Sequence, residues 1–459
     1  MLTIAKKFKL ILTFTIVMVL SLSVSNNPIR VIAKSNTGNT TNTSNNKAVL
    51  EKRTSNYVSQ FIKGNFDDFY KDSAEQIRKS ITKSALKQGW DEIMVQTGKP
   101  GKVISCKYSQ KENMSIVAEE VECTLYNIII TISYNSSGVP VGIWTNFVPK
   151  APPKPQTSDK WEEIPVTVGE KKLPGMLTLP KGVQKPPVVI MIQGSGAHDM
   201  NESLGPVPNR PFEDIAFGLA EQGIATLRYN KSTYQYPADG GDTIEYEVLD
   251  DAAAAVKMLC NDKRVDTERI YLLGHSLGGM LAPKIANDNF QIKGFISMAG
   301  SLRSLQDIML DQCKAAIDAE NTLTEQQKND SLKQIEAEIE KTKAKDATGT
   351  DYILGATGNY WKSLNDIDSM AIVKNLEVPM LILQGSADFQ IYPDKDYKLW
   401  QTTLEGRNNV TYHLYEGLSH LFMPNQISAN GIPDISVYYA PNHVEPQVIM
   451  DIAAWINGL

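Results

Sequence analysis

The stretch Tyr271-Leu-Leu-Gly-His-Ser-Leu-Gly-Gly279 decides the fold of this chain. An apolar run at 270–273 leads into the pattern Gly-x-Ser-x-Gly, and a stretch of helical character begins at Leu277. A strand, a sharp turn and a helix in this order are the setting in which such a serine acts as a nucleophile. Glycines two residues either side let the backbone bend and let strand and helix approach without a clash. The alternative is a glycine-rich turn around a buried serine.

The whole chain has the composition of a globular protein with more than one core. It has 459 residues, too many for one ordinary core, so two or three units are expected. The net charge is −6, and neither a basic stripe nor a nucleic-acid motif accompanies it. Nucleic acid is therefore not expected as a partner.

The amino terminus resembles an export signal. Lys6, Lys7 and Lys9 precede a mostly apolar stretch at 10–24, which is short for a membrane span and suits a signal peptide, predicted over 1–33. Small residues suited to cleavage stand at Ser23-Val-Ser25 and Val31-Ile-Ala33, and the absence of a cysteine directly after the run excludes a lipoprotein anchor. We expect a secreted or cell-surface protein. An uncleaved membrane anchor is the alternative.

Four cysteines are too few for a disulfide scaffold. Cys106 and Cys123 flank an expected turn at 111–113 and would face each other if those flanks pair, as a disulfide or as two separate thiols. Cys260 and Cys313 have the surroundings of core residues. No cysteine or histidine pair has metal-ligand spacing, so neither a metal nor another cofactor is expected.

The first half of the chain divides by composition. Residues 34–46 are almost all Ser, Thr, Asn and Gly and predict a flexible spacer. Residues 47–150 show helical periodicity, then four strand-like segments, and predict a small α+β domain. This domain resembles the cystatin-like or nuclear-transport-factor-2-like domain of unknown function that precedes some secreted hydrolases. A proline-rich linker follows at 151–160.

From 161 to 459 strands alternate with helices, which predicts a doubly wound, mostly parallel α/β sheet. The alternation breaks at 301–369, where Thr322-Leu-Thr-Glu325 is expected to cap a charged helix. We expect this helical insertion to form a cap or lid, because ligands bind at the carboxyl edge of such sheets. A solvated helical hairpin without a substrate role is the alternative.

A serine nucleophile at this turn needs a carboxylate and a histidine base, in the chain order serine, acid, histidine. The loop Glu416-Gly-Leu-Ser-His420 follows the last strand and is able to return an imidazole to Ser276, so His420 is the candidate base. His275 lies inside the turn and is expected to point away from the base position. The remaining histidines lie before the serine, in a strand-like alternation or at a helix start: His198, His413 and His443.

The acid should follow the preceding strand. Asp388 stands there, directly after Gly385-Ser-Ala, and is placed to accept a hydrogen bond from the imidazole Nδ1–H. Asp394 and Asp396 are the rivals, but they follow Pro393 and resemble residues of a first helical turn.

An oxyanion hole needs two backbone N–H groups. The glycine-rich loop Gln193-Gly-Ser-Gly196 follows the strand at 187–192, so the N–H groups of Ser195 and Leu277 are the candidates. A tight glycine-rich turn without a catalytic role is the alternative.

Together these motifs resemble an α/β-hydrolase, and in particular a branch of secreted carboxylesterases with a small amino-terminal domain. The motifs are Gln193-Gly-Ser-Gly196, Asn209-Arg-Pro-Phe212, Leu227-Arg-Tyr-Asn230, Gly274-His-Ser-Leu-Gly-Gly279, Met298-Ala-Gly300, Gly385-Ser-Ala-Asp388 and His420. The resemblance implies hydrolysis of short-chain acyl esters by Ser276, His420 and Asp388 without a cofactor. Relatives often have Asp-Lys-Arg where this chain has Asn230-Lys-Ser232, which would shift substrate preference if that arginine shapes the pocket.

The same three residues also serve other activities. A serine aminopeptidase needs a pocket for a free amine, and no convincing acidic pair for it is evident. A deacetylase acting on cell-wall or other extracellular polysaccharide is a further alternative, because the fold does not select the substrate. A non-catalytic surface protein is disfavoured by the complete set of residues. Hydrolases that attack with a carboxylate have Asp at the turn, where this chain has Ser276.

Overall fold

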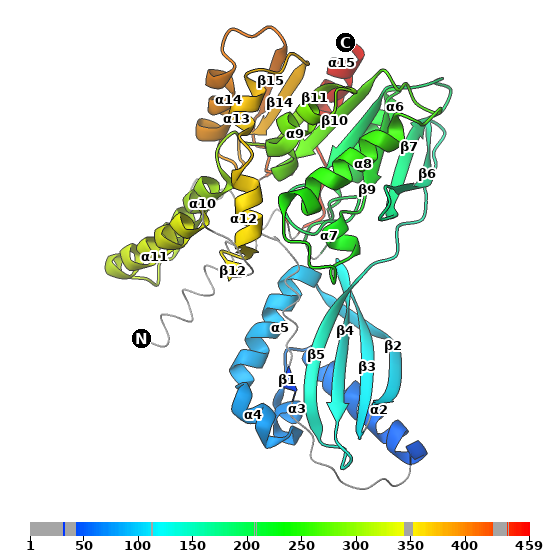
Figure 1. Ribbon diagram of the computed structural model, residues 1–459, viewed down its shortest axis with the longest axis vertical. Coiled ribbons are helices and arrows are strands. Elements are labelled where there is room, and N and C mark those ends of the chain that lie inside the picture. Colours follow the sequence, from blue (N-terminus) through cyan, green and yellow to red (C-terminus); the bar gives the residue numbers. More distant parts are fainter. Residues whose placement is uncertain are drawn as a thin grey trace. The chain divides into compact units, whose positions relative to one another are not determined.

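The computed structural model describes residues 31–32, 43–111, 113–205, 207, 209–343, 352–425, 438 and 440–459. These residues form two compact units that divide between Ala151 and Pro152 (Figure 1). The predicted signal peptide and spacer lie outside the described residues, apart from Val31–Ile32 and the first turn of the helix Thr43–Phe61, whose first four residues belong to the predicted spacer. Each unit is described by itself.

The first unit is an antiparallel sheet with helices against one face, as expected for a small α+β domain. The strand order is β1-β5-β4-β3-β2. Burial alternates along β3, so the inward side chains pack on the helices while the others face away. The strands are β1 (Val31–Ile32), β2 (Pro100–Lys111), β3 (Met114–Cys123), β4 (Tyr126–Tyr134) and β5 (Pro140–Pro149). The helices are α2 (Thr43–Phe61), α3 (Asp67–Asp72), α4 (Glu75–Ser80) and α5 (Lys83–Thr97).

The register of β2 and β3 separates Cys106 from Cys123. Lys111 pairs with Met114 at the turn, so Cys106 lies opposite Glu119, and Cys123 lies opposite Pro100. Both thiols are free. The turn therefore lies where the sequence predicted it, but Cys106 and Cys123 are not placed symmetrically about it. A bridge between them would need a turn about two residues further along the chain.

The second unit is built on an eight-stranded sheet of order β15-β14-β11-β10-β8-β9-β7-β6. The pairs from β9 through β8, β10, β11 and β14 to β15 are parallel, whereas β7 is antiparallel to both its neighbours. This confirms the predicted mostly parallel sheet. The strands are β6 (Trp161–Val168), β7 (Leu173–Pro180), β8 (Val188–Ile192), β9 (Ala225–Tyr229), β10 (Ile270–His275), β11 (Ile292–Met298), β14 (Met380–Gly385) and β15 (Val410–Tyr415).

Helices cover both faces of this sheet, and two separate apolar cores result. Ile190 and Leu272 face the core under α8 (Asp250–Leu259) and α9 (Leu277–Asp288), whereas Val189 and Leu273 face the core under α6 (Pro211–Glu221) and α15 (Pro446–Asn457). Strands buried on both faces are continuous apolar runs, which explains the sequence of β8. The remaining helices of the second unit, apart from those of the insertion, are α7 (Ser232–Gln235), η1 (Glu245–Leu249), α13 (Ser369–Val373), η2 (Pro393–Tyr397) and α14 (Lys398–Thr403).

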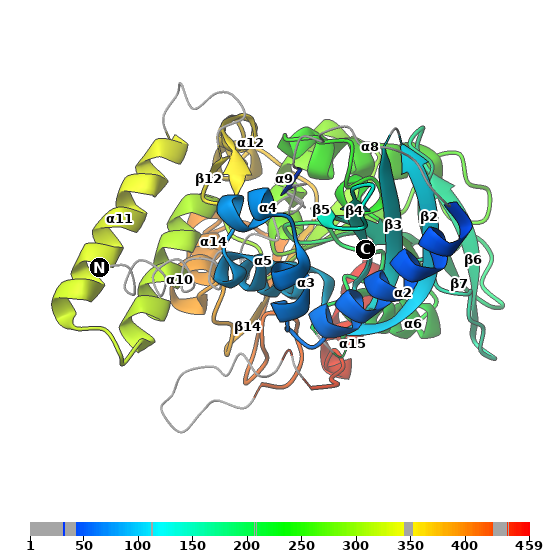
Figure 2. The ribbon, with the colours of Figure 1, turned by 90° about the horizontal axis from the view of Figure 1, so that it is seen from below.

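The predicted insertion at 301–369 is largely helical. It contains α10 (Leu305–Ala319), α11 (Glu325–Lys343), the short strands β12 (Tyr352–Ile353) and β13 (Ala356–Thr357), and α12 (Gly358–Asn365). Helices α10 and α11 lie side by side in both views (Figures 1 and 2). The capping box uses Thr324 and Gln327, which exchange hydrogen bonds of 2.9 and 3.3 Å, rather than the expected Thr322 and Glu325.

Candidate active site

Ser276 occupies a strained turn between β10 and α9. Its φ of 53° and ψ of −114° lie in a region that residues with a side chain rarely adopt. The flanking glycines make the turn possible, because a Cβ on Gly274 would stand 2.2 Å from the Gly278 oxygen, and one on Gly278 would stand 2.4 Å from the Ile192 oxygen. The Ser276 N–H also donates to the Met298 oxygen at 2.9 Å. The turn therefore holds the serine at the carboxyl end of the central strand.

Asp388 and His420 form a buried pair. The His420 Nδ1 lies 2.8 Å from Asp388 Oδ2, and each residue is only 3% exposed. Asp388 is fixed by three further donors: Gln384 Nε2 at 2.9 Å, and the backbone N–H groups of Gln390 and Ile391 at 2.8 and 3.0 Å. Because the carboxylate accepts from Nδ1, the imidazole keeps its proton on that nitrogen and leaves Nε2 as an acceptor.

The two rival carboxylates lie elsewhere. Asp396 is buried and accepts from the Ser301 hydroxyl at 2.5 Å and from the Tyr392 N–H at 2.9 Å, whereas Asp394 is exposed. Neither contacts a histidine among the contacts of the described residues. The structure thus brings His420 together with Asp388, as the sequence predicted.

The other histidines have different partners. His275 contacts Glu202 through Nδ1 and the His420 backbone oxygen through Nε2, both at 2.9 Å. His198 Nε2 lies 2.8 Å from the Ser195 oxygen. The two remaining histidines are paired with carboxylates away from the turn: His413 with Asp451 and His443 with Asp214. His275 therefore does not point away from the base as expected: its ring lies beside that of His420, with the two ring centroids 4.7 Å apart, and it contacts the backbone of that residue.

A pocket at the turn collects the predicted oxyanion residues. Ser195 and Leu277 line it together with Ser276. Leu277 begins α9, and the first N–H groups of a helix have no partner inside it. A Cβ on Gly194 would stand 3.2 Å from Ser276 Cβ, so the loop that carries Ser195 packs directly on the serine. Both predicted donors therefore come from elements that border the same pocket.

The other six lining residues are four apolar side chains and two glutamines, and three of the six belong to the cap. Helix α10 contributes Leu305, Ile308 and Gln312, and the rest of the lining is Met280, Gln390 and Ile391. The cap therefore borders the pocket that holds Ser276. This contact favours a cap with a substrate role over a solvated hairpin.

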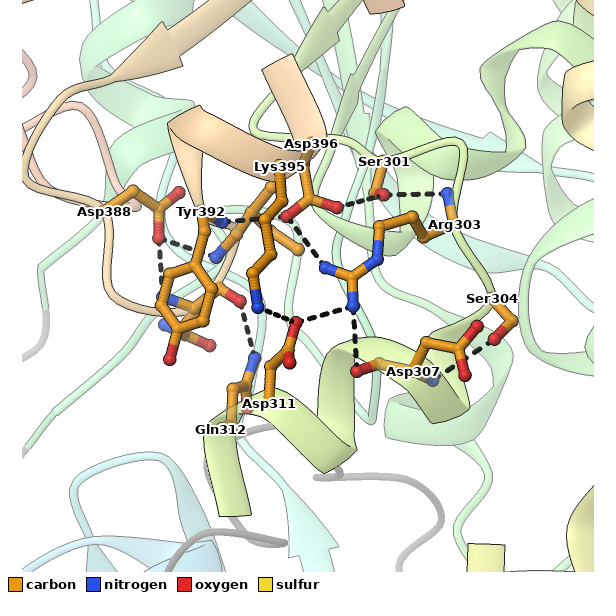
Figure 3. A network of polar contacts seen from close by, with 12 residues as sticks. Ser301, Arg303, Ser304, Asp307, Asp311, Gln312, Asp388, Tyr392, Lys395 and Asp396 are labelled. Carbon is orange, nitrogen blue, oxygen red and sulfur yellow. Dashed lines mark hydrogen bonds and ion pairs between the residues drawn. The ribbon is translucent and has the colours of Figure 1, made fainter. Parts of the chain in front are cut away.

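A polar network fastens α10 to the segment after Asp388 (Figure 3). Asp311 accepts from Arg303 at 2.6 Å and pairs with Lys395 at 2.9 Å, while Arg303 also reaches Asp396 at 3.4 Å. The Gln312 amide donates to the Gln390 oxygen at 2.8 Å. These contacts join the cap to the acid loop, so the shape of the pocket depends on both.

Three buried charged residues near the turn were not predicted from the sequence. Glu202 accepts from the Gly194 N–H at 2.6 Å, and Lys231 donates to the Gly194 oxygen at 2.8 Å and pairs with Glu247 at 2.7 Å. The only signal for them was the position of Lys231 two residues after β9, a strand that ends at the same sheet edge. Their roles depend on contacts between distant segments.

Ser232, which stands where relatives often have an arginine, is not among the residues that line the pocket. The Ser232 hydroxyl and N–H donate to Asp251 at 2.6 and 2.7 Å, and Lys171 donates to the Ser232 hydroxyl at 3.1 Å. A cation from another segment thus stands beside Asp251. The expected effect on substrate preference stays a prediction.

The described residues contain no group of three or more His, Cys, Asp and Glu side chains arranged to hold a metal ion. Within the same part of the chain, no helix is both long and apolar enough to span a membrane.

Comparisons with known proteins find both similar sequences and similar structures. Residues 210–426 match the family described as serine aminopeptidase, S33. The chain is 31% identical over 410 residues to esterase EstD of Thermotoga maritima, which covers 87% of this chain and 93% of that protein. Among solved structures, Est1E of Butyrivibrio proteoclasticus is 18% identical with a TM-score of 0.41, over 64% of this chain and 98% of that one. An esterase of Pyrococcus furiosus is 14% identical with a TM-score of 0.38, over 60% and 88%.

Proposed function

The chain belongs to the α/β-hydrolase family and is a hydrolase that acts on esters, and from this premise we propose that it is a secreted serine carboxylesterase for short acyl chains. Ser276 is the nucleophile, His420 the base and Asp388 the acid that orients it. The observation that carries this proposal is the buried pair of His420 and Asp388, whose side chains lie 2.8 Å apart. The backbone oxygen of His420 also contacts His275, the residue before Ser276 in the turn.

The arrangement supports an acyl-enzyme mechanism. His420 Nε2 takes the Ser276 hydroxyl proton as the oxygen attacks the ester carbon, and the carbonyl oxygen becomes an oxyanion. The N–H groups of Ser195 and Leu277 stabilise that charge. As the tetrahedral intermediate collapses, His420 returns the proton to the departing alcohol. Water then attacks the acyl-enzyme, with His420 again as the base, and releases the acid and free Ser276.

The lining of the pocket favours short acyl chains. Met280, Leu305 and Ile308 are nearly or fully buried and stand on two helices, α9 and α10, that both border Ser276. An apolar acyl group gains roughly 0.8 kcal/mol for each CH₂ it buries, but only as far as these walls allow. A small acyl ester is therefore the proposed substrate.

Secretion is supported by the basic and apolar pattern of the amino terminus. Because Val31 and Ile32 pair with Ile143 and Gly142, cleavage at the earlier small-residue site, 23–25, would keep β1 in the sheet. Cleavage after Ala33 would remove it. Amino-terminal sequencing of exported protein distinguishes these two products from an uncleaved anchor.

An aminopeptidase is the second candidate, because the matching family carries that description. A free amine needs a carboxylate partner, whereas the residues that line the pocket include none. Gln312 and Gln390 are its polar groups besides the serines. We therefore prefer the esterase.

The deciding experiment measures hydrolysis of nitrophenyl esters from acetyl to palmitoyl, with aminoacyl nitroanilides and an acetylated polysaccharide beside them. We expect activity on short esters that Ser276→Ala removes while the protein stays folded. Retained ester hydrolysis in that variant would refute the role of Ser276. Activity on the nitroanilides or the polysaccharide alone would select the corresponding alternative, and binding without turnover of any substrate would select the non-catalytic protein.

A further inference from the structure

Buried side chains hold the backbone of the loop that carries Ser195 on every side. The Gly194 N–H donates to Glu202 at 2.6 Å, and the Gly196 N–H donates to Glu247 at 2.7 Å. The backbone oxygens are held as well, Gly194 O by Lys231 at 2.8 Å and Ser195 O by His198 at 2.8 Å. Few turns need so many charged side chains, because the backbone N–H and C=O groups of a turn normally find hydrogen-bond partners within the turn itself.

The contact of Lys231 fixes the direction of one N–H group in particular. In a trans peptide the C=O of one residue and the N–H of the next point in opposite directions. Lys231 Nζ holds the Gly194 oxygen, so the Ser195 N–H of the same peptide plane points away from Lys231. Ser195 lines the pocket together with Ser276, whereas Lys231 is not among the lining residues. The lysine thus aims the donor that the oxyanion requires.

Glu247 keeps this lysine in place. Lys231 and Glu247 are 2% and 3% exposed, and Glu247 Oε1 accepts from both the Lys231 ammonium and the Gly196 N–H. Burying such a pair gains little stability, since apolar side chains of similar volume often serve as well. One carboxylate oxygen and one ammonium therefore grip both ends of the Gly194–Gly196 turn.

A second buried pair ties the same loop to the base. Glu202 accepts from the Gly194 N–H and from His275, and the opposite nitrogen of His275 faces the His420 oxygen. A carboxylate and a carbonyl are both acceptors, so His275 donates from both nitrogens as an imidazolium. Burial by itself lowers the pKa of His275, but Glu202 and the carbonyl outweigh it, so the pKa is raised.

We propose that Lys231 is a positioning residue of the oxyanion hole, which orients the Gly194–Ser195 peptide so that the Ser195 N–H faces the pocket, with Glu247 holding the lysine. This inference rests on the proposed function of Ser276. Without the ammonium, the Gly194 oxygen loses its partner and the peptide plane is free to rotate. The Ser195 N–H then no longer meets the oxyanion, while the walls that bind the ground-state ester are unchanged.

The test compares Lys231→Met with Lys171→Met in the full chain. Both replacements remove an ammonium and keep an unbranched apolar stem. Lys171 is a matched control, because it contacts Ser232 and the Tyr246 ring and has no contact with the 193–196 loop among the described contacts.

In Lys231→Met we expect kcat on nitrophenyl acetate to fall about 10²–10³-fold, the loss typical of one oxyanion donor. KM should change less than about threefold, because ground-state binding is kept. Lys171→Met should keep the wild-type kcat.

A second measurement, the affinity for a transition-state analogue, distinguishes a positioning role of Lys231 from a merely structural one. An alkyl boronic acid that adds to Ser276 carries a negative oxygen and should lose affinity by the same factor as kcat in Lys231→Met. The double variant Lys231→Met/Glu247→Gln avoids leaving a lone buried carboxylate, while the glutamine oxygen still accepts the Gly196 N–H. We expect the double variant to fold with a normal thermal midpoint and to show the same loss of kcat.

Either folded variant with kcat and boronate affinity within about threefold of the wild type would overturn the proposal, because a lost oxyanion donor costs far more. Failure of the esterase proposal looks different, since then the wild type hydrolyses none of the esters. In that case the rate at which a fluorophosphonate labels Ser276 still tests the inference, because this reaction needs the oxyanion hole but no particular substrate. A rate that is equal in wild type and Lys231→Met, or absence of labelling in both, overturns it.

Discussion

Replacing Asp388 with asparagine tests the acid while leaving the shape of the site almost unchanged. The Oδ1 position receives the N–H groups of Gln390 and Ile391, so an amide NH₂ there would face two donors. The asparagine oxygen therefore takes this position, and the NH₂ takes the position of Oδ2. There it faces His420 Nδ1 and the Gln384 amide.

The consequence for His420 follows from its two nitrogens. Facing an NH₂ donor, Nδ1 becomes an acceptor and the proton moves to Nε2, the nitrogen that must take the proton from Ser276. A serine hydrolase with this wrong tautomer loses kcat by about 10⁴-fold. That factor corresponds to about 5 kcal/mol of transition-state stabilisation. The lost contact with Gln384 costs a further ~1–3 kcal/mol, which falls on folding stability rather than on kcat.

The assay is release of nitrophenol from nitrophenyl acetate at neutral pH, with thermal midpoints measured on the same samples. Asp396→Asn is the matched control, because Asp396 is an equally buried carboxylate that contacts Ser301 and Tyr392 instead of His420. We expect Asp388→Asn to lose about 10⁴-fold in kcat and the control to keep activity in its folded fraction. A kcat of Asp388→Asn within tenfold of the wild type refutes the reasoning. The large loss in Asp396→Asn alone would make Asp396 the acid.

Three further predictions concern other parts of the chain. Burial raises the pKa of Glu119 and outweighs its hydrogen bond from Ser55, so stability is lost as pH rises through the folded-state pKa. Glu119→Gln should therefore raise the thermal midpoint of unfolding at pH 8 and leave it nearly unchanged at pH 4. Equal midpoints of the variant and the wild type at pH 8 would contradict this. Ile308→Ala should destabilise the protein by ~2–5 kcal/mol and raise the ratio of octanoyl to acetyl hydrolysis, whereas an unchanged ratio would remove Ile308 from the acyl wall. The fragment 161–459 should keep kcat within about threefold, since no candidate residue lies before it; a folded but inactive fragment would show that the first unit is required.

The sequence alone predicted the features that depend on local pattern and chain order. The apolar run, the glycines and Ser276 predict the turn, because strand, turn and helix are each encoded within a few residues. Asp388 and His420 follow from the order of acid and base after late strands. The mostly parallel sheet follows from alternating strands and helices, and the structure confirms it.

Only the tertiary structure decided what depends on register and on contacts between distant segments. The β2–β3 register places Cys106 opposite Glu119 instead of Cys123, and two threonines, Thr322 and Thr324, left the helix cap ambiguous. Lys231 and Glu247 are 16 residues apart, and each reaches a different end of the 193–196 loop. A buried charge looks like any surface charge in a sequence. Its partner is set by the packing of whole elements, because the free energy of that packing comes from the two apolar cores and not from the charged pair.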